Sequence, residues 1–527
     1  MRKTMKFLLF LVLLCFHVSP RSIQGQDADT NNSVGAERTT VRIDLPSAIR
    51  QLLSDNLDLQ IERIEPKAAD ALVTQARGQF DPTFSASINY LDSKKDLTTQ
   101  EFLTYGGTLA EFNKLNGRAK LFEEEILAFE TAIAGKLPFG SSYALRQSVQ
   151  QIENTLIRES TVNLYDPETQ FKVSLEWTQP LLRNFGFDAG LATMRVLLKQ
   201  RDAMRHTLRR NTSLALADLV LAYHDLLALH REVLARKEDV SLHEKVLSNR
   251  ILQQERGLAS ERQIRRTRHD LLTARQVLAE SESRALRSQD AFSRLIEGER
   301  DLTIPVKRYE PIPDGRALPP ATDREGSLRK ALESRADYQQ ALSEAEGAKV
   351  ELSFARDQSL PKLDFTATIG ANGLSQRYPK AFNQAFHSGN EEFDGKLGFS
   401  YPLFNRSARG LLSEKQKRIA QAILNIKRVE ILIAHDIDAA YAGIEVHSRR
   451  VNLASRLSET FRNEMKEERM KIERGVAPPD LLIPLQISLS GALVKEWQTR
   501  ADLAKAVYQL FLAEGSLAER LGLSFTE

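Results

Sequence analysis

Side chains at catalytic or metal-binding spacing are scarce in this chain of 527 residues. His224 and His230 are six positions apart in a segment predicted to be helical, whereas two metal ligands on one helix face need a spacing of three or four. The sequence has no His-Glu-x-x-His pair, phosphate-binding loop, dinucleotide fingerprint or nucleophile elbow. We therefore expect no enzyme activity, no catalytic residues, and no metal or cofactor site.

The charge of the chain is nearly balanced, with 73 lysines and arginines against 70 aspartates and glutamates. A net charge of +3 argues against a dedicated nucleic-acid-binding protein, so no nucleic acid is expected as a partner. The high charged fraction of 27% is typical of long helices with solvated faces.

Residues 1–25 are predicted to be a secretory signal peptide. Three basic residues, Arg2, Lys3 and Lys6, precede an apolar stretch, Phe7–Phe16, that is too short to span a bilayer. The only cysteine, Cys15, lies in that stretch, and we expect it to be removed with the signal; a lipid anchor at Cys15 is the alternative. Without Cys15 the mature chain has no disulfide, so its stability must come from packing or assembly.

Two parts of the chain resemble each other. Residues 47–84 align on residues 326–363 without a gap, at a constant offset of 279 positions. Two later pairs of segments follow in the same order, so a whole supersecondary unit is predicted to be duplicated. The matched positions include Arg50 with Arg329, Leu53 with Leu332, Asp58 with Asp337, Pro82 with Pro361, Trp177–Leu182 with Phe399–Phe404, and Arg256–Ala259 with Arg474–Ala477.

Each unit contains two stretches in which apolar and polar residues alternate: Phe84–Tyr90 and Phe171–Trp177 in the first, Leu363–Ile369 and Leu397–Tyr401 in the second. A period of two with one apolar face is typical of a half-buried strand. After the signal we find no apolar run approaching the ~20 residues of a membrane helix. Membrane insertion would therefore require a β-barrel.

The two units differ mainly between their strands. The first unit has two further alternating stretches, around 127–136 and 143–150, which predict an extra hairpin. The sequence leaves open whether this hairpin enlarges the barrel or caps it outside.

Two very long antiparallel helices are predicted in each unit by apolar residues that recur every seven positions, a pattern of left-handed coiled coils. One helix runs from about Leu191 to Glu255, and its partner returns after a turn at Gly257; Gly475 marks the equivalent turn of the second unit. The heptad residues are Leu219, Leu226, Val233, Val240 and Leu247, then Ile264, Leu271, Leu278, Ala285 and Phe292, then Ile419, Ile426 and Ile433, and finally Leu482, Leu489, Leu503, Leu510 and Leu517.

Prolines mark the predicted boundaries. A shorter helix is expected from Pro46 to about Gly78, with a kink at Pro66. Four more prolines lie where strand and helix exchange, either to turn the chain between two barrels or as ordinary helix breakers, and both roles are structural. These are Pro82, Pro180, Pro361 and Pro402.

The order predicted for each unit is short helix, strand, strand, very long helix, long helix, so one chain has four principal strands. Four strands cannot close a barrel, and free strand edges are not tolerated in hydrocarbon. We expect several copies to pool their strands, eight from two copies or 12 from three, and both counts are permitted for membrane barrels. The alternative is a non-channel periplasmic coiled-coil scaffold whose strands form a small soluble sheet.

The doubled layout, the string Gln-Pro-Leu-Leu-Arg-Asn-Phe-Gly at Gln179–Gly186, its partner Tyr401–Arg406 and the Arg-Gly turns resemble the TolC family of outer-membrane efflux proteins. The resemblance covers nearly the whole mature chain. It implies a mixed, mainly-α fold with transmembrane β: a homotrimer whose 12-stranded β-barrel in the outer membrane is continuous with a periplasmic α-helical barrel.

The same resemblance implies a function. The chain would be a channel-tunnel that passively exports drugs, metals or polypeptides, located in the cell outer membrane with helices extending into the periplasm. It would act in a tripartite pump with a periplasmic adaptor protein and an inner-membrane transporter. Outer-membrane lipid would surround its barrel.

The resemblance also assigns the tips of the two helical hairpins to the periplasmic entrance, where the adaptor makes contact. Glycine supplies a left-handed turn there, and small residues let a partner helix approach closely. Without a partner these residues would be plain helix connectors. The adaptor-contact residues are Arg256, Gly257, Leu258, Ala259 and Ser260 in the first tip, and Arg474, Gly475, Val476 and Ala477 in the second.

Asp480 and Arg262 are the possible residues of an entrance gate. Some family members hold a ring of aspartates just past the second tip, and Asp480 is the acid nearest to that place; capping the last helix is its alternative role. Arg262 belongs to a basic cluster beside the first tip, which is either a solvated helix face or an anion-selective mouth. The other members of that cluster are Arg265, Arg266 and Arg268.

The predicted domains follow from these boundaries. They are a signal peptide at 1–25, a flexible N-terminal segment at 26–43, efflux repeat 1 at 44–297, a proline-rich connector at 298–326 and efflux repeat 2 at 327–523.

Overall fold

The computed structural model of the chain describes residues 40–96, 98, 100, 121–155, 165–297, 308–313, 323–474, 476 and 482–523. The predicted signal peptide and Cys15 lie outside these residues.

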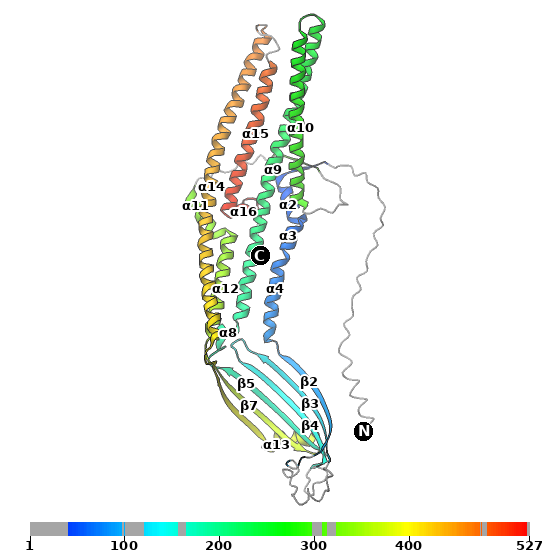
Figure 1. Ribbon diagram of the computed structural model, residues 1–527, viewed down its shortest axis with the longest axis vertical. Helices are drawn as coiled ribbons and strands as arrows, with labels where there is room; N and C mark the ends of the chain where they lie inside the picture. The colour runs from blue at the N-terminus through cyan, green and yellow to red at the C-terminus, as the bar shows by residue number, and fades with distance from the viewer. Residues whose placement is uncertain are drawn as a thin grey trace, which may run out of the picture.

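The described chain is elongated, with long helices at one end and a six-stranded sheet at the other (Figure 1). Two helical hairpins point away from the sheet: α9 (Ala192–Glu255) with α10 (Glu261–Glu297), and α14 (Arg406–Glu473) with α15 (Leu482–Ala513). The remaining helices are α2 (Leu45–Asp55), α3 (Leu57–Glu62), α4 (Ile64–Arg77), α8 (Gly186–Gly190), α11 (Arg324–Ser334), α12 (Ala336–Gln358), α13 (Tyr378–His387) and α16 (Leu517–Arg520).

The heptad positions pack these helices as expected. Leu219, Ile264 and Ile433 are buried, as are Leu489 and Leu510. At 1.5 Å per residue, the 64 residues of α9 extend over about 96 Å. One expectation is wrong: α9 does contain a window long and apolar enough to cross a membrane. In the fold α9 packs against α10, α12, α15 and α4, and 39% of this window is buried, so part of its apolar surface belongs to the helical core.

The sheet corrects the predicted number of strands. Its order is β2 (Thr83–Asp96), β3 (Leu121–Lys136), β4 (Ser142–Asn154), β5 (Glu168–Pro180), β7 (Lys362–Ser375) and β8 (Glu391–Ser400), and all neighbours are antiparallel. The extra hairpin, β3 and β4, lies between the two predicted strands of the first unit. One chain therefore supplies six strands instead of four, and three copies would supply 18 instead of 12.

The turn of this hairpin packs against the start of the helical region. The amide of Gly186 donates to the carbonyl oxygen of Phe139 at 3.0 Å, and the Phe139 and Phe187 rings are 6.0 Å apart. A Cβ at Gly190 would lie 2.1 Å from the carbonyl oxygen of Pro138, so only glycine permits this approach. The hairpin is thus an integral part of the sheet.

The predicted flexible segment 26–43 and connector 298–326 each contain a strand. β1 (Thr40–Ile43) pairs in parallel with β6 (Arg308–Pro311). The buried Tyr223 hydroxyl of α9 donates to the carbonyl oxygen of Ile312 at 2.5 Å, which ties this small sheet to the helical core. The two segments differ from expectation because their pairing is between residues far apart in the sequence.

The shorter helix predicted from Pro46 to Gly78 is broken at Asn56 and Arg63, and not at Pro66. Pro66 is the third residue of α4, where its missing N–H has no intrahelical partner to lose. Asn56 has extended backbone angles, and its side chain caps α3 by accepting from the amide of Leu59 at 2.9 Å.

Candidate channel surfaces

The six-stranded sheet has one apolar and one polar face. The strand register places Trp177 beside Tyr143, Leu175 beside both Leu145 and Ile369, and Ile369 beside Phe393, all on one face. These side chains are not covered by protein. The exposed large apolar residues of this face include Phe84, Ile88, Tyr90, Leu127, Phe129, Ile133, Leu145, Leu175, Trp177, Phe365, Ile369, Phe393, Leu397 and Phe399.

The opposite face carries polar side chains and ion pairs. Arg146 and Glu176 are 2.8 Å apart, and Lys172 reaches Glu392 at 2.7 Å across the intervening strand β7. This face is hollowed: a depression of about 400 Å³ lies over β2 to β5 and is lined by serines, Glu130, Arg146 and Lys172. A sheet with one exposed apolar face and one hollowed polar face has the pattern of a membrane β-barrel wall.

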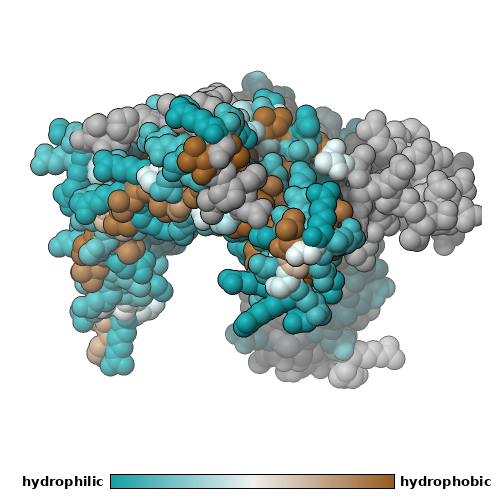
Figure 2. Space-filling view, turned by 90° about the horizontal axis from the view of Figure 1, so that it is seen from above, coloured by the Kyte–Doolittle hydropathy of each residue, from teal (hydrophilic) through white to brown (hydrophobic). Residues whose placement is uncertain are grey.

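Seen from above, the molecule forms an arch around an open space (Figure 2). Hydrophilic residues predominate on the visible surface, with apolar patches between them. The described residues of one chain therefore line this space on one side and do not close around it.

The first hairpin tip is fully described. Gly257 has a φ of +74°, and the amides of Gly257 and Leu258 donate to Gln254 and Gln253 at 2.8 Å each, which is a Schellman end to α9. The Gln263 side chain then holds the start of α10, because its Oε1 accepts from the amide of Ser260 at 2.8 Å and from the Ser260 hydroxyl at 3.2 Å. The helices are thus ended by local bonds, and Leu258 is left 75% exposed.

The second tip is described in part. Arg474 and Val476 are placed, whereas Gly475, Ala477 and Asp480 lie outside the described residues. The amide of Val476 donates to the carbonyl oxygen of Lys471 at 2.9 Å, the same five-residue step that Leu258 makes to Gln253. Val476 is 77% exposed. Both tips therefore present one apolar side chain to solvent at the same place in a helix end.

The basic cluster lies on the first turns of α10. Arg262, Arg265, Arg266 and Arg268 are all exposed, and Arg265 pairs with Glu261 at 2.7 Å. A hollow of about 370 Å³ lies between this hairpin and the start of α15, lined by Arg266, Asp270 and Pro484 among others. The proposed gate residue Arg262 does not line it.

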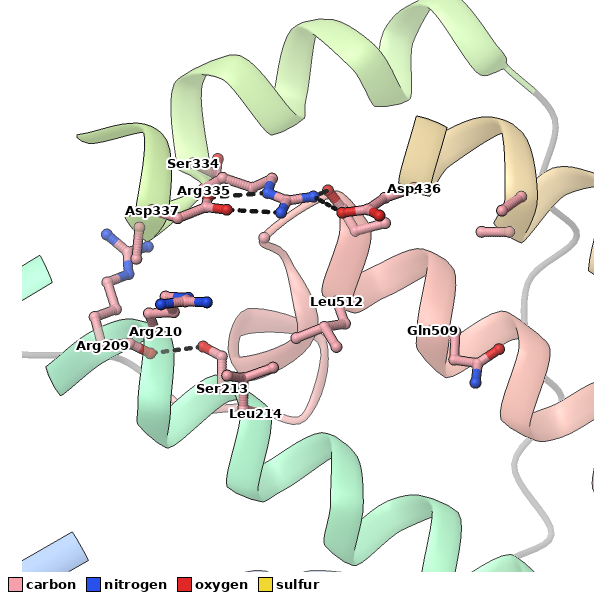
Figure 3. A pocket seen from close by; sticks show the side chains of 15 residues that line it. Arg209, Arg210, Ser213, Leu214, Ser334, Arg335, Asp337, Asp436, Gln509 and Leu512 are labelled. Carbon is pink, nitrogen blue, oxygen red and sulfur yellow. Dashed lines mark hydrogen bonds and ion pairs between the residues drawn. The ribbon is translucent and has the colours of Figure 1, made fainter. Parts of the chain in front are cut away.

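A second hollow, of about 450 Å³, lies where α11 meets α12 (Figure 3). Arg335 sits between two carboxylates: Nη2 is 2.7 Å from Asp337, and Nη1 is 2.7 Å from Asp436 of α14. Burial on its own would lower the pKa of Arg335 and raise that of Asp337. The hydrogen bonds and charges of the cluster outweigh burial, so the pKa of Arg335 is raised and the pKa of Asp337 is lowered.

The described residues contain no group of three or more histidine, cysteine or acidic residues that could hold a metal ion. Sequence reasoning found the two tips but missed the Arg335 cluster and helix α13. The spacing of Tyr378, Phe382 and Phe386, four positions apart, and Pro379 in the first turn were the signals that could have found α13.

Residues 327–522 match the family described as "Outer membrane efflux protein". No curated protein matches the chain. The family match confirms the resemblance to the TolC family and agrees with the predicted location in the cell outer membrane.

Several solved structures share the fold. The Campylobacter jejuni CmeC outer membrane channel is 12% identical, with 94% of each chain covered and a TM-score of 0.59. The outer membrane protein VceC from Vibrio cholerae is 14% identical, with 92% of this chain and 97% of that chain covered and a TM-score of 0.55. The open Neisseria gonorrhoeae MtrE outer membrane channel is 15% identical, with 94% and 96% covered and a TM-score of 0.54. At these identities the likeness establishes the fold.

Proposed function

Because residues 327–522 belong to the outer membrane efflux protein family and the described chain has the fold of outer membrane channels, we propose that three copies form a channel-tunnel. It passively exports molecules that an inner-membrane transporter and a periplasmic adaptor deliver. The observation that carries this proposal is the six-stranded sheet, whose exposed apolar face and hollowed polar face suit lipid and water respectively.

The edges of the sheet support assembly. Within the described residues, β2 and β8 each have a partner strand on one side only. Unpaired N–H and C=O groups are not tolerated in hydrocarbon, so β2 of one copy must pair with β8 of the next. Three copies then close 18 strands, an even number found in water-filled barrels of the porin class.

The helices support the same assembly. The face of α14 that is not packed within the chain exposes apolar residues at heptad spacing, Leu424 with Ile431 and Val446 with Leu453. An exposed seam of this kind on a long helix favours a neighbouring helix as its cover. Neighbouring copies in a helical tube would supply that helix.

The tips support docking of an adaptor. Their helix ends are satisfied by their own backbone bonds, so Leu258 and Val476 have no structural need to be apolar. Exposed apolar side chains flanked by a turn are suited to contact a partner helix.

Reconstitution of the purified mature protein in planar bilayers, together with native mass measurement, tests the proposal. A trimer with measurable conductance is expected, whereas a soluble monomer without conductance would favour a periplasmic coiled-coil scaffold. The barrel size is tested by the β-sheet content and conductance of a variant lacking residues 121–154. A barrel of 12 strands has about two thirds of the diameter of one of 18, so the open conductance of this variant should fall to roughly half. When the hairpin tips are closed, they limit the current and hide the effect of a narrower barrel. Conductance is therefore compared between open events only.

A further inference from the structure

Helix α13 lies directly on the apolar face of the sheet, near its end farthest from the hairpin tips (Figure 1). Ala381 and Ala385 are buried against β5 and β7. A Cβ at Gly373 of β7 would lie 1.9 Å from the carbonyl oxygen of Ala381, so the helix backbone rests on a position without a side chain. This close seating holds α13 in place.

An aromatic stripe runs along one flank of α13. Tyr378, Phe382 and Phe386 are four positions apart and surround Phe171 of β5, with ring centroids 6.0, 5.2 and 6.2 Å from the Phe171 ring. Phe171 is buried beneath them, but the three stripe residues remain 43, 44 and 52% exposed. The described residues therefore leave a large apolar surface on α13 uncovered.

The other flanks of α13 are polar, and they orient the stripe. The Gln384 side chain accepts from the amide of Leu374, close to the end of β7, and at 100° per residue it lies nearly opposite Phe382. The stripe therefore faces the middle of the sheet. Lys380, Asn383 and His387 share the side of the helix that points away from the sheet, and all three are exposed.

The opposite end of the same face has its own aromatic pair, Tyr143 beside Trp177, near the helical region. Between the two ends lie Leu145, Leu175 and Ile369. The seven residues from Phe171 to Trp177 span six steps of 3.3 Å, or about 20 Å, comparable to the ~25 Å apolar band of membrane barrels. Aromatic belts at both edges of an aliphatic band mark the two membrane interfaces.

We infer that α13 is an interfacial helix on the outside of the barrel, whose stripe of Tyr378, Phe382 and Phe386 binds lipid of the outer leaflet. The stripe lies at the boundary of the acyl chains, and Lys380 and His387 face the headgroups. The helix thereby fixes the depth of the barrel in the membrane. This inference rests on the proposed function, since it needs a sheet whose apolar face meets lipid.

Tryptophan quenching in vesicles tests the inference, because the chain has only Trp177 and Trp497. A Trp497→Phe variant leaves Trp177 as a reporter of the sheet face. A second variant, with Trp177→Phe, Trp497→Phe and Phe382→Trp, places the single reporter on the stripe. Its matched control carries Asn383→Trp instead, on the polar side of α13. Each protein is reconstituted in phosphatidylcholine vesicles brominated either near the headgroup or near the chain ends, after its oligomer mass has been checked.

We expect quenching of the Phe382→Trp reporter, stronger for bromine near the headgroup than near the chain ends, and weaker quenching of the Asn383→Trp control by both lipids. If Trp177 is quenched and the Phe382→Trp reporter is not, α13 is covered by protein or water and the inference is overturned. If Trp177 itself is not quenched, the apolar face does not meet lipid and the proposed function fails first. Equal quenching of the two α13 reporters would remove the assigned orientation and overturn the inference as well.

Discussion

Two helix breaks lie 279 positions apart, at equivalent places in the two halves of the chain, and they are held by different chemistry. Asn56 separates α2 from α3 with φ −66° and ψ 115°, and Arg335 separates α11 from α12 with φ −68° and ψ 125°. Each side chain reaches the end of the second long helix of its own half. Asn56 donates to the carbonyl oxygen of Leu295 at 2.8 Å, and Arg335 to that of Ala513 at 3.4 Å.

The difference lies in what else each side chain holds. The Asn56 amide caps its own helix and needs no charged partner. The Arg335 guanidinium binds Asp337 of its own helix and Asp436 of α14, and it lines the hollow of Figure 3. The bend is therefore common to both halves, whereas of the two residues at the breaks it is Arg335 that makes an ionic link to a neighbouring long helix. Removing each side chain should separate the cost of the bend from that of the link.

Arg335→Ala should have the largest effect on stability. The Arg335 side chain is only 14% exposed, and its removal leaves the partly buried Asp337 without its cation. Losing one partner of a buried ion pair costs about 3 kcal/mol. Thermal unfolding of the detergent-solubilised protein measures this, and Arg335→Lys, which keeps the charge but not the two-pronged geometry, should lose clearly less. Equal losses for the two variants would mean that the geometry of the guanidinium carries the whole effect.

Asn56→Ala should cost about 1–2 kcal/mol, because it removes a helix cap and leaves the Leu295 carbonyl without its donor. Asn56→Ser is the matched control: serine can still cap α3 but is too short to reach Leu295. Its loss should be about half, by the same unfolding measurement. A loss for Asn56→Ala as large as that of Arg335→Ala would contradict the idea that the ionic link is the costlier one.

These breaks also mark how far the sequence predicts the fold. The heptads of α9 and α14 identify helices because burial repeats along one chain, and Leu219 and Ile433 are buried as expected. The break at Asn56 was missed because Pro66 was the stronger local signal, although a proline in the first turn of a helix breaks no bond.

Non-local packing accounts for the other differences. The alternation around 127–150 predicts a hairpin, but its place between β2 and β5 depends on cross-strand pairing and on the close fit of Pro138 against Gly190. Helix α13 is seated by Gly373 of another element, which no local pattern reveals. At the tips, the glycine turn at Gly257 was predicted because a Schellman end is encoded locally.

The acid dependence of unfolding should sharpen the same comparison with a smaller effect. The pKa of Asp337 is lowered in the folded protein because its hydrogen bond to Arg335 and the attraction of that charge outweigh burial. A lowered folded pKa contributes stability that is complete above the unfolded value of about 3.9 and is lost as pH falls through the folded value. Asp337→Asn should therefore flatten the loss of stability below about pH 4, whereas Asn56→Ala should leave that slope unchanged.

The two tips are a second pair of equivalent positions, and here the chemistry matches. Leu258→Ser and Val476→Ser should each change stability by less than about 0.5 kcal/mol, since both side chains are exposed and the helix ends are held by backbone bonds.

Docking of a partner at the tips should be affected instead. Because the chain's only cysteine, Cys15, lies in the predicted signal, Leu258→Cys gives a single thiol for maleimide cross-linking in intact cells. Leu258→Cys should give a cross-linked product that contains a second polypeptide, and adding Val476→Ser should lower the yield of that product. Leu286→Cys, on the exposed side of α10, should give no such product. If both cysteines capture the same polypeptide equally, contact is not confined to the tips. If Leu258→Ser itself lowers stability by several kcal/mol, the apolar tip residues are structural and the likeness of the two tips reflects folding alone.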